Sequence, residues 1–145
     1  MDMQSKRTIL CIEDSDEDYE TIERVVLQTG LAKIARSING TQGLQLLRDK
    51  ERGHSIELVL LDLNMPGLDG RDVLREIKTD EDLRLKPVVV FTTSSNPRDI
   101  QCCYRYGVNS YHLKPIDLHD FEAVVQTIID YWLNKSISFR TGVDV

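Results

Sequence analysis

The sequence predicts an α/β fold: a doubly wound, five-stranded parallel sheet with helices on both faces. Short continuous apolar runs alternate along the chain with segments whose apolar residues recur at helical spacing. The runs are bounded by polar or turn residues, as expected for parallel strands that are buried on both faces. Strands that alternate with helices in this way form one parallel sheet with helical crossovers.

The strand candidates differ in strength. Residues 9–12, 58–61 and 88–91 are each four apolar residues in a row, and they are the strongest candidates. Residues 33–38 and 109–113 are weaker candidates, because their apolar residues are interrupted. Together they supply the five strands of the predicted sheet.

Helical spacing separates these strands. Apolar residues recur at helical intervals over residues 22–26, 44–47 and 73–77. The clearest stripe lies between Phe121 and Leu133 and follows Asp117, a suitable N-cap, so we expect a helix over residues 118–134.

Cys102 and Cys103 lie within a further predicted helix. Adjacent helical residues point to different faces, so at most one of the two is expected to be buried.

Length and charge limit the possible functions. The chain has 145 residues, which fits one domain; we expect it over residues 6–135, followed by a C-terminal tail over 136–145. The 18 basic and 24 acidic residues give a net charge of −6. This charge argues against sequence-independent binding to nucleic acid or to an anionic membrane.

The cysteine content predicts a reducing compartment. Cys11, Cys102 and Cys103 cannot form a full disulfide framework and lack the spaced pairs of a zinc site. No apolar segment is long enough for a signal peptide or a membrane span. We therefore expect a cytoplasmic protein.

Polar side chains follow four of the predicted strands. They are Glu13, Asp14, Asp62, Thr92, Thr93 and Lys114. In an open α/β sheet, ligands bind outside the carboxyl ends of the strands, so these side chains are expected to converge at one edge.

This set of residues fits phosphoryl chemistry. Three neighbouring carboxylates repel one another unless a cation lies among them, and oxygen ligands suit Mg²⁺. Asp62, at the end of the middle strand, is the candidate nucleophile that accepts the phosphoryl group. Lys114 and the Thr92 hydroxyl are candidates for binding phosphoryl oxygens.

The same residues resemble those of the receiver domains of two-component response regulators. The matching parts are Glu13 and Asp14, the D-L-N-M-P-G-L-D-G run over 62–70, Thr92, and Y-H-L-K-P over 111–115. They span nearly the whole domain in the right order. The 62–70 run, which follows a hydrophobic strand, is the most specific of them.

The resemblance implies a flavodoxin-like sheet with strand order 2-1-3-4-5 and a phosphoacceptor at Asp62. The donor would be a phosphohistidine on a sensor histidine kinase. Mg²⁺ would be held by Asp14, Asp62 and the backbone carbonyl of Asn64, with Glu13 acting mostly through water.

The resemblance also assigns roles in switching. Thr92 and Tyr111 would form the switch pair, with Thr92 drawn toward the phosphoryl group while the Tyr111 ring turns inward. Asn64 and Ser94 occupy positions that tune the lifetime of the phosphorylated state. The bond between Lys114 and Pro115 is expected to be cis.

Such a protein would be a switch and not an enzyme acting on an external substrate. It would catalyse phosphoryl transfer to itself and its own dephosphorylation. Its output would be altered binding to other proteins near Tyr111.

A closer resemblance is to the stand-alone regulators paired with cyanobacterial phytochrome kinases. It rests on F-T-T-S-S over 91–95, the long segment 78–86 and the extended terminal helix. It implies a phytochrome-type kinase as partner and a homodimer through the face formed by the fourth helix, fifth strand and fifth helix.

Two other functions stay open. The D-x-D motif at 14–16 is similar to that of haloacid-dehalogenase-type phosphatases, with Asp14 as nucleophile and Asp16 as acid, but it leaves residues 62–70 unexplained. The other is a flavodoxin-like module that binds FMN, although the acidic loop after the first strand would repel the FMN phosphate.

Overall fold

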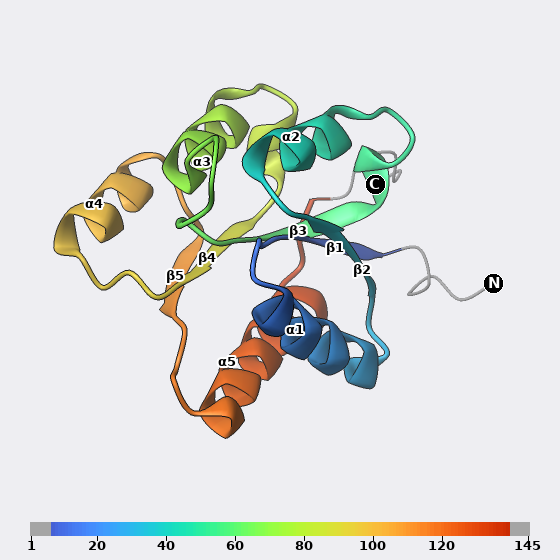
Figure 1. Ribbon diagram of the computed structural model, residues 1–145. Helices are drawn as coiled ribbons and strands as arrows, with labels where there is room; N and C mark the ends of the chain where they lie inside the picture. The colour runs from blue at the N-terminus through green and yellow to red at the C-terminus, as the bar shows by residue number, and fades with distance from the viewer. Residues whose placement is uncertain (1–6, 140–145) are drawn as a thin grey trace.

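The structure is a computed structural model that describes residues 7–139, and it contains a parallel sheet in the order β2-β1-β3-β4-β5 (Figure 1). The strands are β1 (Thr8–Ile12), β2 (Lys33–Ser37), β3 (Ile56–Leu61), β4 (Val88–Thr92) and β5 (Ser110–Leu113). The predicted fold class and strand order are confirmed, and each strand candidate forms a strand.

Helices cover both faces of the sheet (Figure 1). They are α1 (Asp16–Thr29) and α5 (Leu118–Asp130) on one face, and α2 (Gly40–Arg48), α3 (Gly70–Thr79) and α4 (Pro97–Arg105) on the other. Short 3₁₀ turns, η2 (Gly53–Ser55) and η3 (Leu83–Leu85), precede β3 and β4. None of the helices described is long and apolar enough to span a membrane.

Two apolar clusters fill the space between the layers. Successive residues of β1 alternate between them: Leu10 and Ile12 pack toward α2 and α3, whereas Ile9 and Cys11 pack toward α1 and α5. Every residue of β3 is buried. The middle strand is therefore fixed from both sides, and so is the residue that follows it.

The C-terminal helix differs from its prediction. The α-helix ends at Asp130 and continues as a π-helical turn, η4 (Tyr131–Lys135). In this turn Leu133 is buried, and its carbonyl accepts a hydrogen bond from Arg7 Nη2 at 2.7 Å. Of the boundary residues predicted for the domain and its tail, residue 6 and residues 140–145 lie outside the described part.

The cysteine pair agrees with its prediction. Cys103 on α4 is fully buried, whereas Cys102 is only partly buried. Burial raises the pKa of Cys103 to about 11, so this thiol stays protonated as part of the core.

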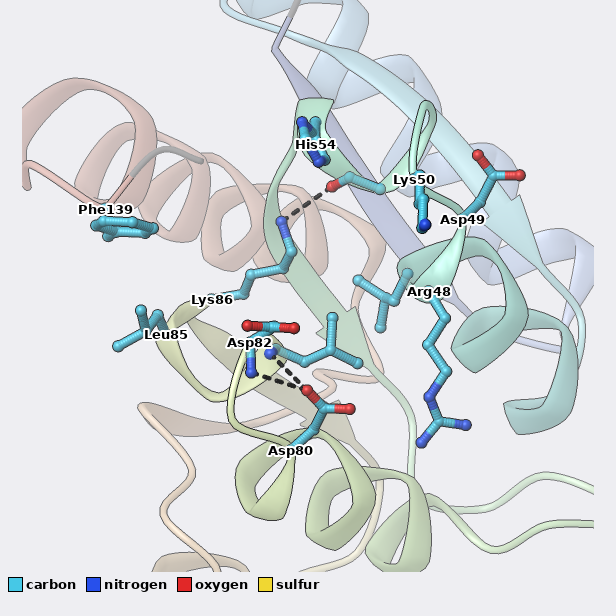
Figure 2. A pocket seen from close by; sticks show the side chains of 12 residues that line it. Arg48, Asp49, Lys50, His54, Asp80, Asp82, Leu85, Lys86 and Phe139 are labelled. Atoms are coloured by element: carbon cyan, nitrogen blue, oxygen red, sulfur yellow. Dashed lines mark hydrogen bonds between the residues drawn. The ribbon is translucent and has the colours of Figure 1, made fainter. Parts of the chain in front are cut away.

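A pocket of about 450 Å³ lies at the amino ends of β3 and β4 (Figure 2). Within it, Lys86 Nζ donates to the carbonyl oxygens of Gly53 and Ile56 at 2.9 and 2.8 Å. Asp80 accepts from two backbone N–H groups at the start of η3. These charged groups hold the turns before the strands, at the edge opposite to the predicted site.

Gly70 begins α3 directly behind the end of β3. A Cβ atom at this position would lie 2.5 Å from the carbonyl oxygen of Asp62 and 2.6 Å from Leu63 Cα. Backbone atoms of a buried strand end cannot move aside cheaply. The final glycine of the 62–70 run is therefore required by the close approach of α3 to the predicted phosphoacceptor.

Replacing Gly70 with alanine is expected to lower the free energy of unfolding by about 1–3 kcal/mol, because the added methyl group overpacks this contact. Urea denaturation would measure the loss. Gly30→Ala is the control: Gly30 has a φ of +66° and a Cβ there would meet nothing within 4 Å, so its cost comes from backbone conformation alone. A Gly70→Ala protein as stable as wild type would contradict the steric account.

Candidate functional site

Three acidic residues come together at the carboxyl edge of the sheet. Glu13, Asp14 and Asp62 each offer a carboxylate oxygen, and these oxygens all lie within 4.8 Å of one another. Glu13 and Asp14 follow β1, whereas Asp62 follows its neighbour β3. The backbone N–H of Asp62 donates to Ile12 O at 3.1 Å, which fixes the two strand ends side by side.

Burial makes this cluster electrostatically costly. Glu13 and Asp62 are 2% and 7% exposed, whereas Asp14 is open to solvent. Burial, and next the charge of Asp62, raise the pKa of Glu13 to about 7, although Lys114 acts in the opposite direction. Because the donors are all carboxylate oxygens, the cluster suits a hard divalent cation such as Mg²⁺.

Lys114 is the cation of the site. It follows β5, and its backbone N–H donates to Thr92 O at 2.8 Å. Its buried ammonium lies 2.5 Å from Glu13 Oε1, 2.8 Å from Asp18 Oδ2 and 3.5 Å from Asp62 Oδ2. Burial alone would lower the pKa of Lys114, but its acidic neighbours outweigh that effect and raise it. The ammonium therefore stays charged.

Asp18 is a site residue that was not predicted from the sequence. It lies in the first turn of α1, where its backbone N–H is bound by the N-cap Ser15 Oγ at 3.2 Å. The S-x-x-D pattern over 15–18 could have located it, since that pattern places the aspartate in a first turn. The first turn of α1 lies at the same edge of the sheet as the acidic cluster.

The predicted switch and lifetime residues lie together. Thr92, the last residue of β4, is fully buried. Its Oγ1 accepts from Asn64 Nδ2 at 3.5 Å and from the backbone N–H of Ser94 at 3.3 Å. The Tyr111 hydroxyl donates to Ser94 O at 2.7 Å. Hydrogen bonds therefore link all four residues.

Ser94 connects the site to two helices. Its Oγ donates to Asp99 Oδ2 at 2.5 Å, and Asp99 Oδ1 accepts from Arg71 Nε at 2.7 Å. Arg71 also pairs with Asp69, the N-cap of α3, at 2.7 Å. The hydrogen bonds from Arg71, and next from Ser94, hold the pKa of Asp99 below its usual range. Neither Asp99 nor Arg71 was predicted from the sequence as a site residue.

One expectation from the resemblance is wrong. Throughout residues 7–139 no peptide bond is cis, so the bond between Lys114 and Pro115 is trans. The trans form of a bond before proline is favoured by about 0.5–1 kcal/mol unless packing imposes the cis form. Ile116, which follows directly, is fully exposed and supplies no such packing.

The structure does not favour the two alternatives. Asp16, the acid that a phosphatase would need, is 83% exposed and pairs with Arg36 at 2.8 Å. The loop after β1 leads directly into α1, and the first turn of α1 carries three acidic residues. Such a turn repels the phosphate of FMN.

Comparisons with known proteins bear on these geometric findings. Residues 9–126 match the response regulator receiver domain. The probable methanogenesis regulatory protein FilR2 of Methanothrix harundinacea is 40% identical over 128 residues, which cover 86% of this chain and 83% of FilR2. Response regulator Rcp1 of Synechocystis sp. is 38% identical over 138 residues, which cover 88% of this chain and 89% of Rcp1.

Solved structures agree with this relationship. The Mn²⁺-bound form of Rcp1 has a TM-score of 0.84 and 37% identity, covering 92% of this chain and 99% of its own. The phosphorylated cyanobacterial phytochrome response regulator RcpA has a TM-score of 0.85 and 34% identity, and the match covers 91% of this chain and 97% of the RcpA chain. With its acids after β1 and β3 and its lysine after β5, this chain belongs to the response regulator receiver domain family.

Proposed function

We propose that this protein is a switch in which Asp62 accepts a phosphoryl group from the phosphohistidine of a sensor histidine kinase. The observation that carries the proposal is the central place of Asp62. On one side, after β1, lie Glu13 and Asp14; on the other, β4 and β5 supply Thr92 and Lys114. Asp62 is therefore the carboxylate set between the acidic cluster and the groups suited to phosphoryl oxygens.

The transfer needs little covalent chemistry from the protein. A carboxylate oxygen of Asp62 forms a bond to phosphorus while the bond from phosphorus to the donor imidazole nitrogen breaks. The Lys114 ammonium and the Thr92 hydroxyl stabilise the phosphoryl oxygens. Asp14, Asp62 and the Asn64 backbone carbonyl would hold Mg²⁺, with Glu13 acting through water, and the bound ion would neutralise charge on the transferred group.

Phosphorylation then biases two conformations that already exist. Thr92 and Tyr111 are the switch pair, and Ser94 lies between them because it bonds to both side chains. Asn64 and Ser94 tune the lifetime of the phosphorylated state, since Asn64 contacts Thr92 and Asp62 directly. The protein dephosphorylates itself and turns over no external substrate.

Likeness to RcpA, described as a cyanobacterial phytochrome response regulator, supports a phytochrome-type kinase as the donor. We place the protein in the cytoplasm, where its free cysteines Cys11, Cys102 and Cys103 stay reduced. We further propose that residues 6–135 form the switch domain and residues 136–145 an appended tail.

A homodimer through α4, β5 and α5 would give the switch an output. β5 is an edge strand of the sheet. Tyr104 on α4 and Leu113 on β5 are 52% and 47% exposed, so this face offers apolar side chains to a partner. Tyr111, one of the switch pair, lies on the same strand.

The phosphoacceptor can be tested by intact mass after incubation with acetyl phosphate and Mg²⁺. The wild type is expected to gain one phosphoryl adduct, and Asp62→Asn none, because the amide is not a competent nucleophile. Asp16→Asn is the control, since Asp16 is exposed and pairs with Arg36. Full uptake by Asp62→Asn, or no uptake by the wild type, would overturn the assignment.

Metal binding can be tested by titration calorimetry with Mg²⁺. Asp14→Asn is expected to weaken binding about tenfold or more, a loss of about 1.4 kcal/mol, because it removes one carboxylate from the cluster. Asp16→Asn removes the same charge from the neighbouring first turn and is expected to keep the wild-type affinity. Equal affinities for Asp14→Asn and the wild type would argue against this metal site.

The dimer can be tested by sedimentation velocity after phosphorylation with acetyl phosphate. Tyr104→Glu is expected to weaken association about tenfold or more, since a charge placed at an apolar contact loses its hydration. Leu27→Glu is a matched control, because Leu27 is 59% exposed on α1. Equal weakening by both changes, or a wild type that stays monomeric, would contradict this interface.

A further inference from the structure

The phosphoacceptor is the most distant of the three carboxylates around Lys114. Glu13 and Asp18 lie 2.5 and 2.8 Å from the Lys114 ammonium, whereas Asp62 lies 3.5 Å away. An ammonium has three N–H donors. Glu13 and Asp18 accept the two shorter hydrogen bonds and Asp62 only the longest one, so the lysine that should bind the phosphoryl group is held mainly by other carboxylates.

The two closer partners are not equivalent. The Glu13 side chain is 2% exposed, so a Lys114 that moved away would leave a buried, unpaired carboxylate. The Asp18 side chain is 31% exposed and water can solvate it when its partner leaves. Asp18 is therefore the carboxylate that Lys114 can release at lower cost.

The interactions of the Asp18 carboxylate also differ from those of Glu13. Within residues 7–139, its carboxylate has no other hydrogen bond or ion pair than those to Lys114. Glu13, in contrast, also accepts from the Ser15 N–H and belongs to the acidic cluster. Asp18 and Lys114 together line a groove of about 320 Å³, so the pair can be reached from solvent.

We propose that Asp18 is a positioning residue that restrains Lys114 before phosphoryl transfer. The ammonium exchanges Asp18 for a phosphoryl oxygen when Asp62 is modified. This inference rests on the proposed phosphoacceptor role of Asp62. Because breaking the Asp18 pair opposes the reaction, Asp18 slows phosphoryl uptake and favours the unmodified form.

The test is the initial rate of adduct formation with acetyl phosphate at saturating Mg²⁺, followed by intact mass. Asp18→Asn is expected to raise this rate about threefold to fivefold, the upper part of the range that corresponds to loss of one partly exposed ion pair. The Ser15 cap binds the backbone N–H of residue 18, so the helix start is retained in the variant. Asp18→Glu keeps the charge and is expected to keep a rate near that of the wild type.

Two further variants distinguish an effect of the Asp18–Lys114 ion pair from an effect of removing a negative charge nearby. Glu17→Gln removes the same charge one residue earlier, where no ion pair to Lys114 exists, and is expected to change the rate less than about twofold. In a Lys114→Ala protein, adding Asp18→Asn is expected to have no effect, since the two changes act through one contact. If Lys114→Ala reacts too slowly for a rate, the Asp18→Glu and Glu17→Gln results decide.

The outcomes are distinct. An Asp18→Asn rate at or below that of the wild type would overturn the inference, as would an equal rise in Glu17→Gln or Asp18→Glu. In each of these cases the wild type still forms its adduct, so the proposed function stands. Absence of an adduct in the wild type would overturn both.

Discussion

The ion pairs of Lys114 are the interaction on which the site depends. Glu13 and Asp62 are buried side by side, and two unpaired carboxylates in such a place would each cost several kcal/mol. The Lys114 ammonium offsets both charges, although β5 is two strands from β3 and three from β1, because its long side chain reaches past the end of β4. The strand order therefore also matters electrostatically, because it brings Lys114 within reach of both buried carboxylates.

The same constraint ties the site to the face that would transmit a signal. The Lys114 N–H donates to Thr92 O, which joins the ends of β5 and β4. From Thr92, hydrogen bonds continue through Ser94 to Asp99 on α4 and to the Tyr111 hydroxyl on β5. A displacement of Thr92 toward Asp62 must therefore disturb bonds held by both elements.

Local patterns explain why so much could be predicted from the sequence. Buried runs predicted the strands, and the rule that ligands gather at strand ends placed Glu13, Asp14 and Asp62 together. Nonlocal contacts explain the rest. Asp18 meets a lysine 96 positions away, and the π-helical turn contains a carbonyl bound by Arg7. The trans bond before Pro115 reflects a small energy difference that sequence alone does not resolve.

The contrast between rigid and exchangeable partners explains how one site can be both stable and responsive. The apolar clusters beneath it are closely packed and contain β1 and β3, so the strand ends cannot shift without a large loss of burial. The charged side chains at the strand ends can be rearranged at a much smaller cost in free energy. A partly exposed carboxylate such as Asp18 is solvated by water when it loses its ion pair with Lys114. Phosphorylation of Asp62 therefore acts on the ion pairs of Lys114 and not on the packed strands. The charge of the phosphoryl group is sufficient to change which groups this lysine binds.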